Sequence, residues 1–467
     1  MFTKNLVRTA LVLSFTALLF TACRKRDAVL PVNYVVFETA AQGIAAAENT
    51  ITVKVKLSRG VSADVPVVIN LAEQGLVYGT DYTTVPAAAA GKISLTVPSG
   101  SNESSFVLTK VAGALFDGDE KIVFDIFSSG SPVLIGSTKQ FSLSFGELVA
   151  SSATATINGG GATYPNKVFI DFSANRQTPV LRTTWDLGLY TGSDDFRVIL
   201  NSSSAMMAKQ INKNDLNTVT AADTVGFSSD VAFSQAAPTT TSLVYIDYPT
   251  GDLTRTAIAS IAATALDNKV YIINRGNGVG SPAPARGWKK IRIIRNASGG
   301  YTLQQADIAA TTFTSFDIAK DDTYFFKYIS FENGAVNVEP QKKKWDIAWT
   351  YFSNATNFGS GEVPYLFQDI VLLNRNVSVA KVLTAIKAYA DFTEADIVAQ
   401  TFLTTQNAIA SDWRSGGGPG TAPAVRTDRY YIIKDGDNNY YKIRFTALTQ
   451  AGERGYPAFE SVLIKKG

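Results

Sequence analysis

The chemistry open to this chain is limited first by the side chains that it lacks. None of its 467 residues is histidine, and its one cysteine is Cys23. Nucleophilic sites built on Ser-His or Cys-His pairs, and metal sites built on imidazole, are therefore excluded. An enzyme would have to use carboxylates, lysine, tyrosine or a Ser-Lys pair. Ser378 and Lys381 match Ser-x-x-Lys without its companion motifs, so we interpret the match as chance and expect a non-enzymatic protein.

The N-terminus resembles the export signal of a bacterial lipoprotein. Basic residues precede an apolar run over 10–20, and the sequence Leu-Phe-Thr-Ala-Cys at 19–23 resembles a lipobox. The run is too short to cross a bilayer as a helix. We therefore expect residues 1–22 to be removed, Cys23 to carry a lipid that anchors the protein to a membrane, and 23–31 to form a tether. The alternative is an ordinary signal peptide with an incidental cysteine.

The charge of the chain gives no sign of nucleic-acid binding. The formal net charge is +3, and removal of residues 1–22 takes away Lys4 and Arg8, which leaves +1. A near-neutral chain with scattered charges lacks the basic surface that phosphate backbones require.

A long segment of the sequence is present twice. Trp185-Asp186 recurs as Trp345-Asp346, and Tyr271-Ile-Ile recurs as Tyr431-Ile-Ile, in both cases with an offset of 160 residues (345 − 185 and 431 − 271). The offset is too long for a solenoid repeat, so we expect each copy to bury its own core. We place copy 1 at 151–310 and copy 2 at 311–467, and interpret the Gly-rich stretch 153–163 at the start of copy 1 as the linker.

Both copies are expected to be rich in β-strands. The predicted strands are 166–172, 185–190, 196–201, 270–274 and 289–295 in copy 1, and 323–331, 344–351, 368–374, 429–434 and 441–446 in copy 2. Apolar residues at helical spacing predict a helix over 379–390. Long polar stretches over 202–267 and 376–428 are the expected places for a binding site.

The segment 32–148 precedes the copies and is predicted to be an antiparallel β-sandwich. Its strands are expected at 51–57, 65–71, 93–97, 105–109 and 122–126. Gly79-Thr-Asp-Tyr-Thr83 and the acidic loop 116–120 resemble motifs of Calx-β domains. That resemblance implies Ca²⁺ ligation by acidic side chains, here Glu48, Asp81, Asp117 and Asp119. The alternative is that Asp81 caps a turn and the acidic loop is solvated.

The two copies share an ordered set of motifs. Copy 2 contains Tyr328-Ile-Ser-Phe-Glu-Asn-Gly334, Trp345-Asp-Ile-Ala-Trp349, Asp369-Ile-Val-Leu-Leu-Asn374 and Tyr441-Lys-Ile-Arg-Phe445. Copy 1 keeps Asp171-Phe-Ser173, Trp185-Asp-Leu-Gly188, Arg197-Val-Ile-Leu-Asn201 and Lys290-Ile-Arg-Ile293. The set resembles the HmuY family of haem-binding lipoproteins over about 160–467. The resemblance implies an all-β fold on the outer membrane or cell surface, and haem taken from haemoproteins and passed to a TonB-dependent receptor.

The haem ligands that this resemblance implies are unusual because histidine is absent. Met206 and Met207, at the start of a long loop, are candidates since a thioether can ligate haem iron; the alternative is that they fill space in the core. Tyr190 is a third candidate. If Trp185, Leu187 and Leu189 share the core face of a strand, Tyr190 points away from it. Copy 2 has Thr350 there and no methionine, so copy 1 is the expected binder.

We therefore expect an all-β lipoprotein in which a Calx-β-like sandwich precedes two HmuY-like domains that bind haem or a related porphyrin. The alternative is a surface protein of the same fold that binds glycans or other proteins, because strand-borne Tyr and Trp also stack on sugars.

Overall fold

The computed structural model describes residues 30–44, 48–116, 118–146, 149–231, 240–357, 359, 361–417 and 420–467. The chain divides into two compact units, Met1–Glu147 and Leu148–Gly467. The expected signal sequence, the lipidation site Cys23 and the acidic residue Asp117 lie outside the described residues, so they stay predictions. No helix in the described parts of the chain is long and apolar enough to cross a membrane.

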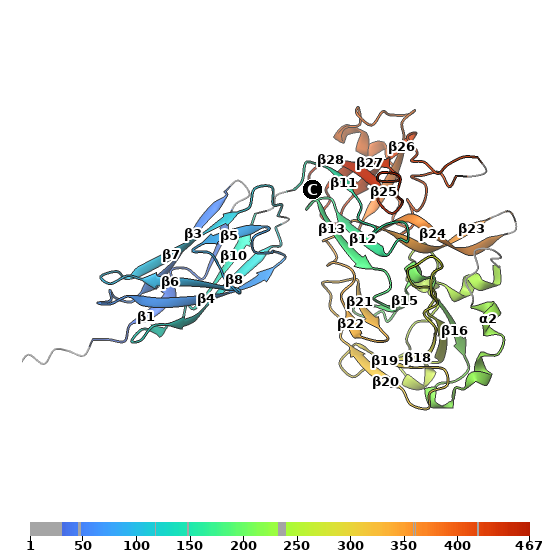
Figure 1. Cartoon of the computed structure of the whole chain (residues 1–467), viewed down its shortest axis with the longest axis horizontal. Helices are drawn as coiled ribbons and strands as arrows, with labels where there is room; N and C mark the ends of the chain where they lie inside the picture. The colour runs from blue at the N-terminus through green and yellow to red at the C-terminus, as the bar shows by residue number, and fades with distance from the viewer. Residues whose placement is uncertain are drawn as a thin grey trace, which may run out of the picture. The chain divides into compact units, whose positions relative to one another are not determined.

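The N-terminal unit is a β-sandwich of two five-stranded sheets (Figure 1). Their orders are β5-β7-β3-β1-β9 and β2-β10-β8-β4-β6, and the bounds are β1 Tyr34–Phe37, β2 Ala41–Ile44, β3 Thr50–Leu57, β4 Val65–Gln74, β5 Tyr82–Val85, β6 Lys92–Val97, β7 Glu103–Lys110, β8 Lys121–Ser129, β9 Leu134–Ile135 and β10 Gln140–Phe145. Alternate residues of β3 face the core between the sheets. The pairing is antiparallel except for β1 with β9 and β10 with β2. All five strands predicted here are present.

Among the acidic residues predicted to bind Ca²⁺, Asp81 caps the turn in which it lies. The carboxylate of Asp81 accepts a hydrogen bond from the backbone N–H of Val77 at 2.8 Å, as a turn cap does. Glu48 and Asp119 are exposed. Among the described residues, no group of three or more His, Cys, Asp or Glu side chains is arranged to hold a metal ion. With Asp117 outside that set, Ca²⁺ binding stays a prediction.

The C-terminal unit consists of two similar halves, each made of a five-stranded and a four-stranded sheet. Half A has the orders β16-β17-β18-β19-β20 and β15-β14-β21-β22. Half B has the orders β11-β28-β27-β26-β25 and β13-β12-β23-β24. The structure is thus all-β, as the sequence predicts.

The strands of half A are β14 Leu187–Tyr190, β15 Val198–Leu200, β16 Met207–Ile211, β17 Val270–Asn274, β18 Trp288–Arg295, β19 Tyr301–Ala306, β20 Thr314–Ile318, β21 Phe326–Ser330 and β22 Gly334–Val336. Those of half B are β11 Ser152–Thr156, β12 Asn166–Asp171, β13 Arg176–Leu181, β23 Ile347–Asn357, β24 Glu362–Leu373, β25 Ser378–Leu383, β26 Arg429–Lys434, β27 Tyr440–Ala447 and β28 Ala458–Lys465. Short helices lie in the long connections: η1 Ser202–Ser204, η2 Leu216–Thr218, η3 Ala221–Thr224, α2 Phe227–Asp230, η4 Thr240–Tyr245, η5 Leu253–Arg255, η6 Ala265–Asp267 and η7 Glu394–Ala399.

The boundaries of the structural halves differ from those of the sequence copies. Half A runs without interruption from β14 to β22, whereas half B combines β11–β13 with β23–β28. In half B, Ile170 of β12 pairs with Ile347 of β23; in half A, Ile329 of β21 pairs with Leu187 of β14. The expectation that each sequence copy buries its own core is therefore wrong, because β12 of copy 1 pairs with β23 of copy 2, and β21 of copy 2 pairs with β14 of copy 1.

All ten strands expected in the two copies are present, but the helix expected at 379–390 is not. Residues Ser378–Leu383 form β25, which pairs antiparallel with β26. Val379 and Val382 face different clusters on opposite sides of the sheet. A strand buried on both faces has apolar residues at positions that can imitate helical spacing, which explains the error.

Expressing two fragments of similar length tests whether the folding unit is the structural half or the sequence copy. The fragment 183–339 contains all strands of half A and should unfold cooperatively in urea. The fragment 151–310 follows the sequence repeat, but it lacks β20–β22 and exposes β11–β13 without their partners. It should give no cooperative transition. The opposite result, with 151–310 folded and 183–339 unfolded, would contradict the pairing described.

Candidate functional site

A buried Asp-Asn pair joins the strands at the centre of half A. The backbone N–H of Asp186 donates to the carbonyl of Ile329 at 2.8 Å, and its Oδ2 accepts from the N–H of Phe331 at 2.8 Å. Asn201 donates its backbone N–H to Asp186 O at 3.0 Å and its side-chain amide to Trp185 O at 2.8 Å. The Trp-Asp and Leu-Asn motifs therefore hold β14, β15 and β21 together.

Half B repeats this network. Asp346 N–H donates to Ile170 O at 2.7 Å, and Asp346 Oδ2 accepts from Phe172 N–H at 2.8 Å. Asn374 donates to Asp346 O at 2.9 Å and, through its side chain, to Trp345 O at 2.7 Å. The equivalent bonds show that both motifs shape the backbone.

The two aspartates differ in the charges around them. Asp186 Oδ1 accepts from Arg275 Nε and from Arg286 Nη2, both at 2.9 Å. At the position of Arg275, half B has Asp435. No Lys or Arg within the described ranges forms an ion pair with Asp346. Burial, followed by the charges of Asp171 and Asp435, raises the pKa of Asp346 well above its usual value.

The tryptophans that precede the two aspartates meet in one cluster between the halves. Trp185 packs edge-on against Tyr328 with ring centroids 4.8 Å apart, and Trp345 packs edge-on against Phe169 at 5.0 Å. Both rings are almost fully buried. We expected Trp185 to share a face with Leu187 and Leu189, which is wrong: β14 begins at Leu187, and the Trp185 ring lies in the other cluster.

A cavity of about 50 Å³ lies beside this cluster, lined by both halves. Half A contributes Trp185, Phe326 and Tyr328 to its wall, and half B contributes Lys167 and Trp345. The Nζ of Lys167 is 5.0 Å from the Phe169 ring centroid and 5.9 Å from that of Trp185. Burial lowers the pKa of the Lys167 ammonium, and the charge of Glu339 partly offsets this.

Glu339 is the acidic group of the cavity. Its Oε1 accepts from the backbone N–H of Phe326 at 2.8 Å, and its Oε2 accepts from the hydroxyl of Tyr328 at 3.0 Å. Burial raises the pKa of this carboxyl, against the opposite effect of the two hydrogen bonds. The cavity is therefore lined by two cationic side chains, Lys167 and Arg375, and by one carboxylate whose two oxygens already accept hydrogen bonds.

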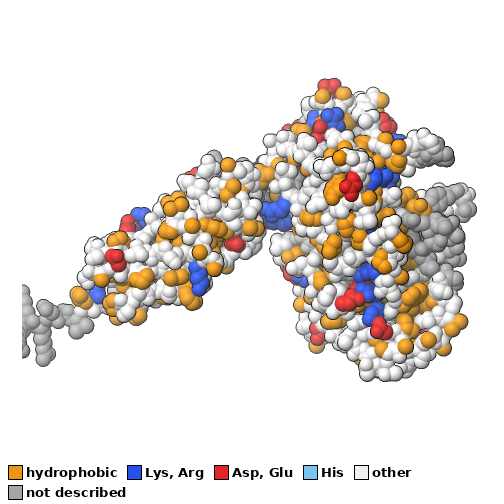
Figure 2. Space-filling view, viewed as in Figure 1, with side chains coloured by type: hydrophobic (Ala, Val, Ile, Leu, Met, Phe, Trp, Pro, Cys, Tyr) orange, Lys and Arg blue, Asp and Glu red, His pale blue; other side chains and the backbone are white. Residues whose placement is uncertain are grey.

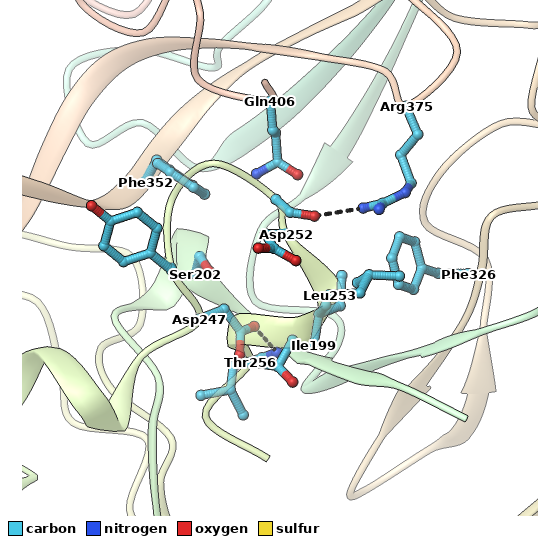
Figure 3. A pocket seen from close by; sticks show the side chains of 13 residues that line it. Ile199, Ser202, Asp247, Asp252, Leu253, Thr256, Phe326, Phe352, Arg375 and Gln406 are labelled. Carbon is cyan, nitrogen blue, oxygen red and sulfur yellow. Dashed lines mark hydrogen bonds between the residues drawn. The ribbon is translucent and has the colours of Figure 1, made fainter. Parts of the chain in front are cut away.

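A second chamber of about 40 Å³ adjoins this cavity, and the two share seven lining residues. Figure 3 shows the side chains that line this second chamber. Arg375 donates from Nη1 to the carbonyl of Gly251 at 2.9 Å across it. Asp247 accepts from the backbone N–H of Leu200 at 2.6 Å and from that of Ala257 at 3.0 Å. Burial raises the pKa of Asp247 to about 7.

None of the predicted haem ligands lines these chambers, although Tyr190 contacts a lining residue. Met206 is 1% exposed in the core of half A, and Met207 is fully buried against Val231 and Ile246. The half-buried Tyr190 packs on Phe326, with ring centroids 5.6 Å apart. Neither thioether can reach a bound porphyrin unless this region opens, so their ligand role stays a prediction.

A wider groove lies on the long connection of half A that follows Met207. Its volume is about 360 Å³, and its described lining residues are Leu243, Val244, Ile246, Tyr248, Arg255 and Thr256. The Arg255 guanidinium carbon lies 3.3 Å from the Tyr248 ring centroid. The sequence indicates this connection as a place for a site, but not which residues form it.

The sequence does not predict the residues that line the cavity, because none of them belongs to a recognisable binding motif in its own segment. Lys167 occupies one alternate position of a strand and Glu339 follows a short strand, more than 150 residues away. One signal was present: Lys167 shares a strand face with Phe169, and that face is buried in the inter-half cluster. Only the crossing of β12 into half B brings these side chains together.

The asymmetry of the two aspartates predicts different effects of one substitution. Asp186→Asn leaves Arg286 without a carboxylate and Arg275 with Glu332 alone, so unfolding free energy should fall by about 3 kcal/mol at pH 7.5. Asp346→Asn keeps an acceptor for Phe172 N–H and removes a repelled charge, so it should be neutral or stabilising. Urea unfolding of both variants checks this.

The same pair predicts a pH dependence. A carboxyl whose folded-state pKa is raised holds its proton more tightly when folded, so its contribution to stability falls as the pH rises above its unfolded pKa of about 4. The advantage of Asp346→Asn over the parent protein should therefore be larger at pH 7.5 than at pH 4.5. An advantage that is equal at both pH values would contradict the raised pKa.

One family model matches the chain in two places. The family model described as HmuY protein matches residues 163–302 and again 322–460, together more than half of the chain. A search of the curated proteins finds no match.

Solved structures similar to the chain include the apo HmuY analog of Tannerella forsythia (10% identity; 68% of this chain and 99% of that chain; TM-score 0.24). A protein of Bacteroides vulgatus described as HmuY-like and heme-binding is 12% identical over 38% of this chain and 93% of its own, with a TM-score of 0.17. The apo form of the Calx CBD1 domain is 18% identical over 25% of this chain and 97% of its own, with a TM-score of 0.21. Because the family model matches both copies over most of their length, this chain belongs to the HmuY family.

Proposed function

We propose that this protein binds haem or a related porphyrin in the groove of half A and passes it to a TonB-dependent receptor, without enzymatic activity. Family membership supports a haem-binding role, and the B. vulgatus relative is described as heme-binding. In this proposal the protein is a lipoprotein of the outer membrane or cell surface, anchored through Cys23.

The observation that carries the proposal is the size and lining of the groove. A volume of about 360 Å³ falls within the range of small-molecule and cofactor sites, whereas the cavity of about 50 Å³ is far too small for a porphyrin. Leu243, Val244 and Ile246 provide an apolar wall for the macrocycle. Arg255 provides a cation for a propionate.

The groove also contains a side chain able to ligate iron. Tyr248 lines it, and a tyrosine phenolate is a known axial ligand of haem iron. Its hydroxyl donates to Glu362 Oε2 at 3.1 Å, a surface bond that a ligand could replace. Tyr248 thus joins Met206, Met207 and Tyr190 as a ligand candidate, with the difference that it is already at the groove.

The charges on the surface fit a small uncharged or amphiphilic ligand better than a polyanion. On the face shown in Figure 2, Lys and Arg side chains lie among Asp and Glu side chains rather than in one basic patch.

The groove can be tested by haemin titration of residues 149–467 with Soret absorbance as the readout. Val244→Asp places a charge in the apolar wall and should weaken haemin binding between about 10- and 100-fold, since burial of a valine side chain is lost. Val398→Asp is the matched control, because both valines are strongly exposed on short 3-10 helices of corresponding connections. Equal effects of the two changes would contradict the groove assignment.

The iron ligand is assigned by three further variants in the same titration. Tyr248→Phe should abolish the ligand-specific Soret band while leaving weaker haemin binding. Met206→Leu with Met207→Leu, and Tyr190→Phe, should leave that band in place if Tyr248 is the ligand. A titration of the parent protein that never saturates would exclude haem binding and favour the glycan- or protein-binding alternative.

A further inference from the structure

We propose that the cavity between the two halves is a binding site for a small oxyanion or carboxylate. The site differs from the porphyrin groove in position, size and chemistry, and does not depend on the proposed function.

The first observation is a pair of buried donors without acceptors. The indole Nε1 atoms of Trp185 and Trp345 are shielded from solvent and have no hydrogen-bond partner in the described structure. Their side chains are 2% and 7% exposed, and both line the cavity. Buried N–H groups are nearly always paired in folded proteins, so two unpaired ones at one cavity indicate that an acceptor belongs there.

The second observation is the excess of cationic and N–H groups around the same space. Lys167 lines the cavity, and no hydrogen bond of its ammonium occurs among the described residues; Arg375 lines both chambers. The one carboxylate, Glu339, already accepts from Phe326 N–H and Tyr328 O–H. The protein supplies donors and positive charge, so the ligand must supply acceptors and negative charge.

The volume selects the size of the ligand. A cavity of about 50 Å³ holds roughly three to five water molecules in the same measure, which is the space of an anion with about four or five non-hydrogen atoms. Nitrate, acetate and phosphate are of this size. The adjoining chamber of about 40 Å³ is lined by Asp247 and Asp252 as well as by Arg375, so we expect the anion to stay in the cavity itself.

The position of the cavity gives such a ligand a structural effect. Trp185 and Tyr328 belong to half A, whereas Lys167 and Trp345 belong to half B. An anion there would accept hydrogen bonds from both halves at once. Its binding should therefore stabilise the halves against separation as well as against unfolding.

The proposal can be tested on residues 30–467, which include both compact units. Sodium nitrate, acetate and phosphate are each titrated at constant ionic strength against sodium chloride, with calorimetry and tryptophan fluorescence as readouts. We expect saturable binding of at least one oxyanion at one site per chain. Lys167→Met should weaken that binding between about 10- and 100-fold, because a charge-assisted hydrogen bond is lost.

Three tryptophan variants make the test specific. Trp185→Phe and Trp345→Phe each remove one indole donor from the cavity and should weaken anion binding about tenfold or more. Trp349→Phe is the matched control, because its Nε1 is also buried without a partner but the side chain does not line the cavity. It should leave the affinity unchanged.

Two outcomes would overturn the proposal. The first is the absence of saturable binding by all three anions, which would mean that the cavity holds water only. The second is binding that Lys167→Met leaves intact, or that Trp349→Phe weakens as much as the cavity variants do. The lysine variant keeps the test decisive if a tryptophan variant does not fold.

Discussion

Each half of the C-terminal unit depends on one buried aspartate that fixes where three strands meet. The carboxylate accepts a hydrogen bond from the backbone N–H of a phenylalanine just after the neighbouring strand, Phe331 for Asp186 and Phe172 for Asp346. The side-chain amide of a nearby asparagine, Asn201 or Asn374, donates to the carbonyl of the tryptophan that precedes the aspartate. Satisfied buried polar groups of this kind specify geometry, because any other register would leave them unpaired. The two tryptophans are thereby placed at the boundary between the halves, where they shape the cavity.

The same backbone hydrogen bonds form around both aspartates, although one lies beside positive charges and the other beside negative ones. In half A, two arginines neutralise Asp186, whereas half B has Asp435 at the position of Arg275, with Asp171 also close to Asp346. The hydrogen bonds from backbone N–H groups are common to both, so they, and not the ion pairs, are what the fold requires. Duplication evidently allowed the surroundings of one aspartate to change while its geometry stayed fixed.

The sequence predicts the strands well because most of them alternate or are fully apolar, and it predicts the family because the Trp-Asp and Leu-Asn motifs occur in order. The sequence does not predict whether a strand pairs within its own copy or with the other copy, because the repeat shows only that the two copies are similar. By sequence, Ile170 could pair with Leu187 of its own copy as well as with Ile347, its partner in the structure. That ambiguity also hides the cavity. Lys167, Glu339 and the two indoles are brought together only by the crossing strands, and no local pattern records this. Met206 and Met207 were singled out by scarcity, which says nothing about burial.

The continuous course of half A, enclosed within the two segments of half B, also orders events during synthesis. All strands of half A have left the ribosome once residue 336 has emerged, so its core can close early. The hairpin β12–β13 is made before half A but has to wait for β23, and β11 for the last strand, β28. The earliest part of this unit to be made is therefore among the last to be stabilised, and a ribosome that stalls between the halves leaves that hairpin exposed.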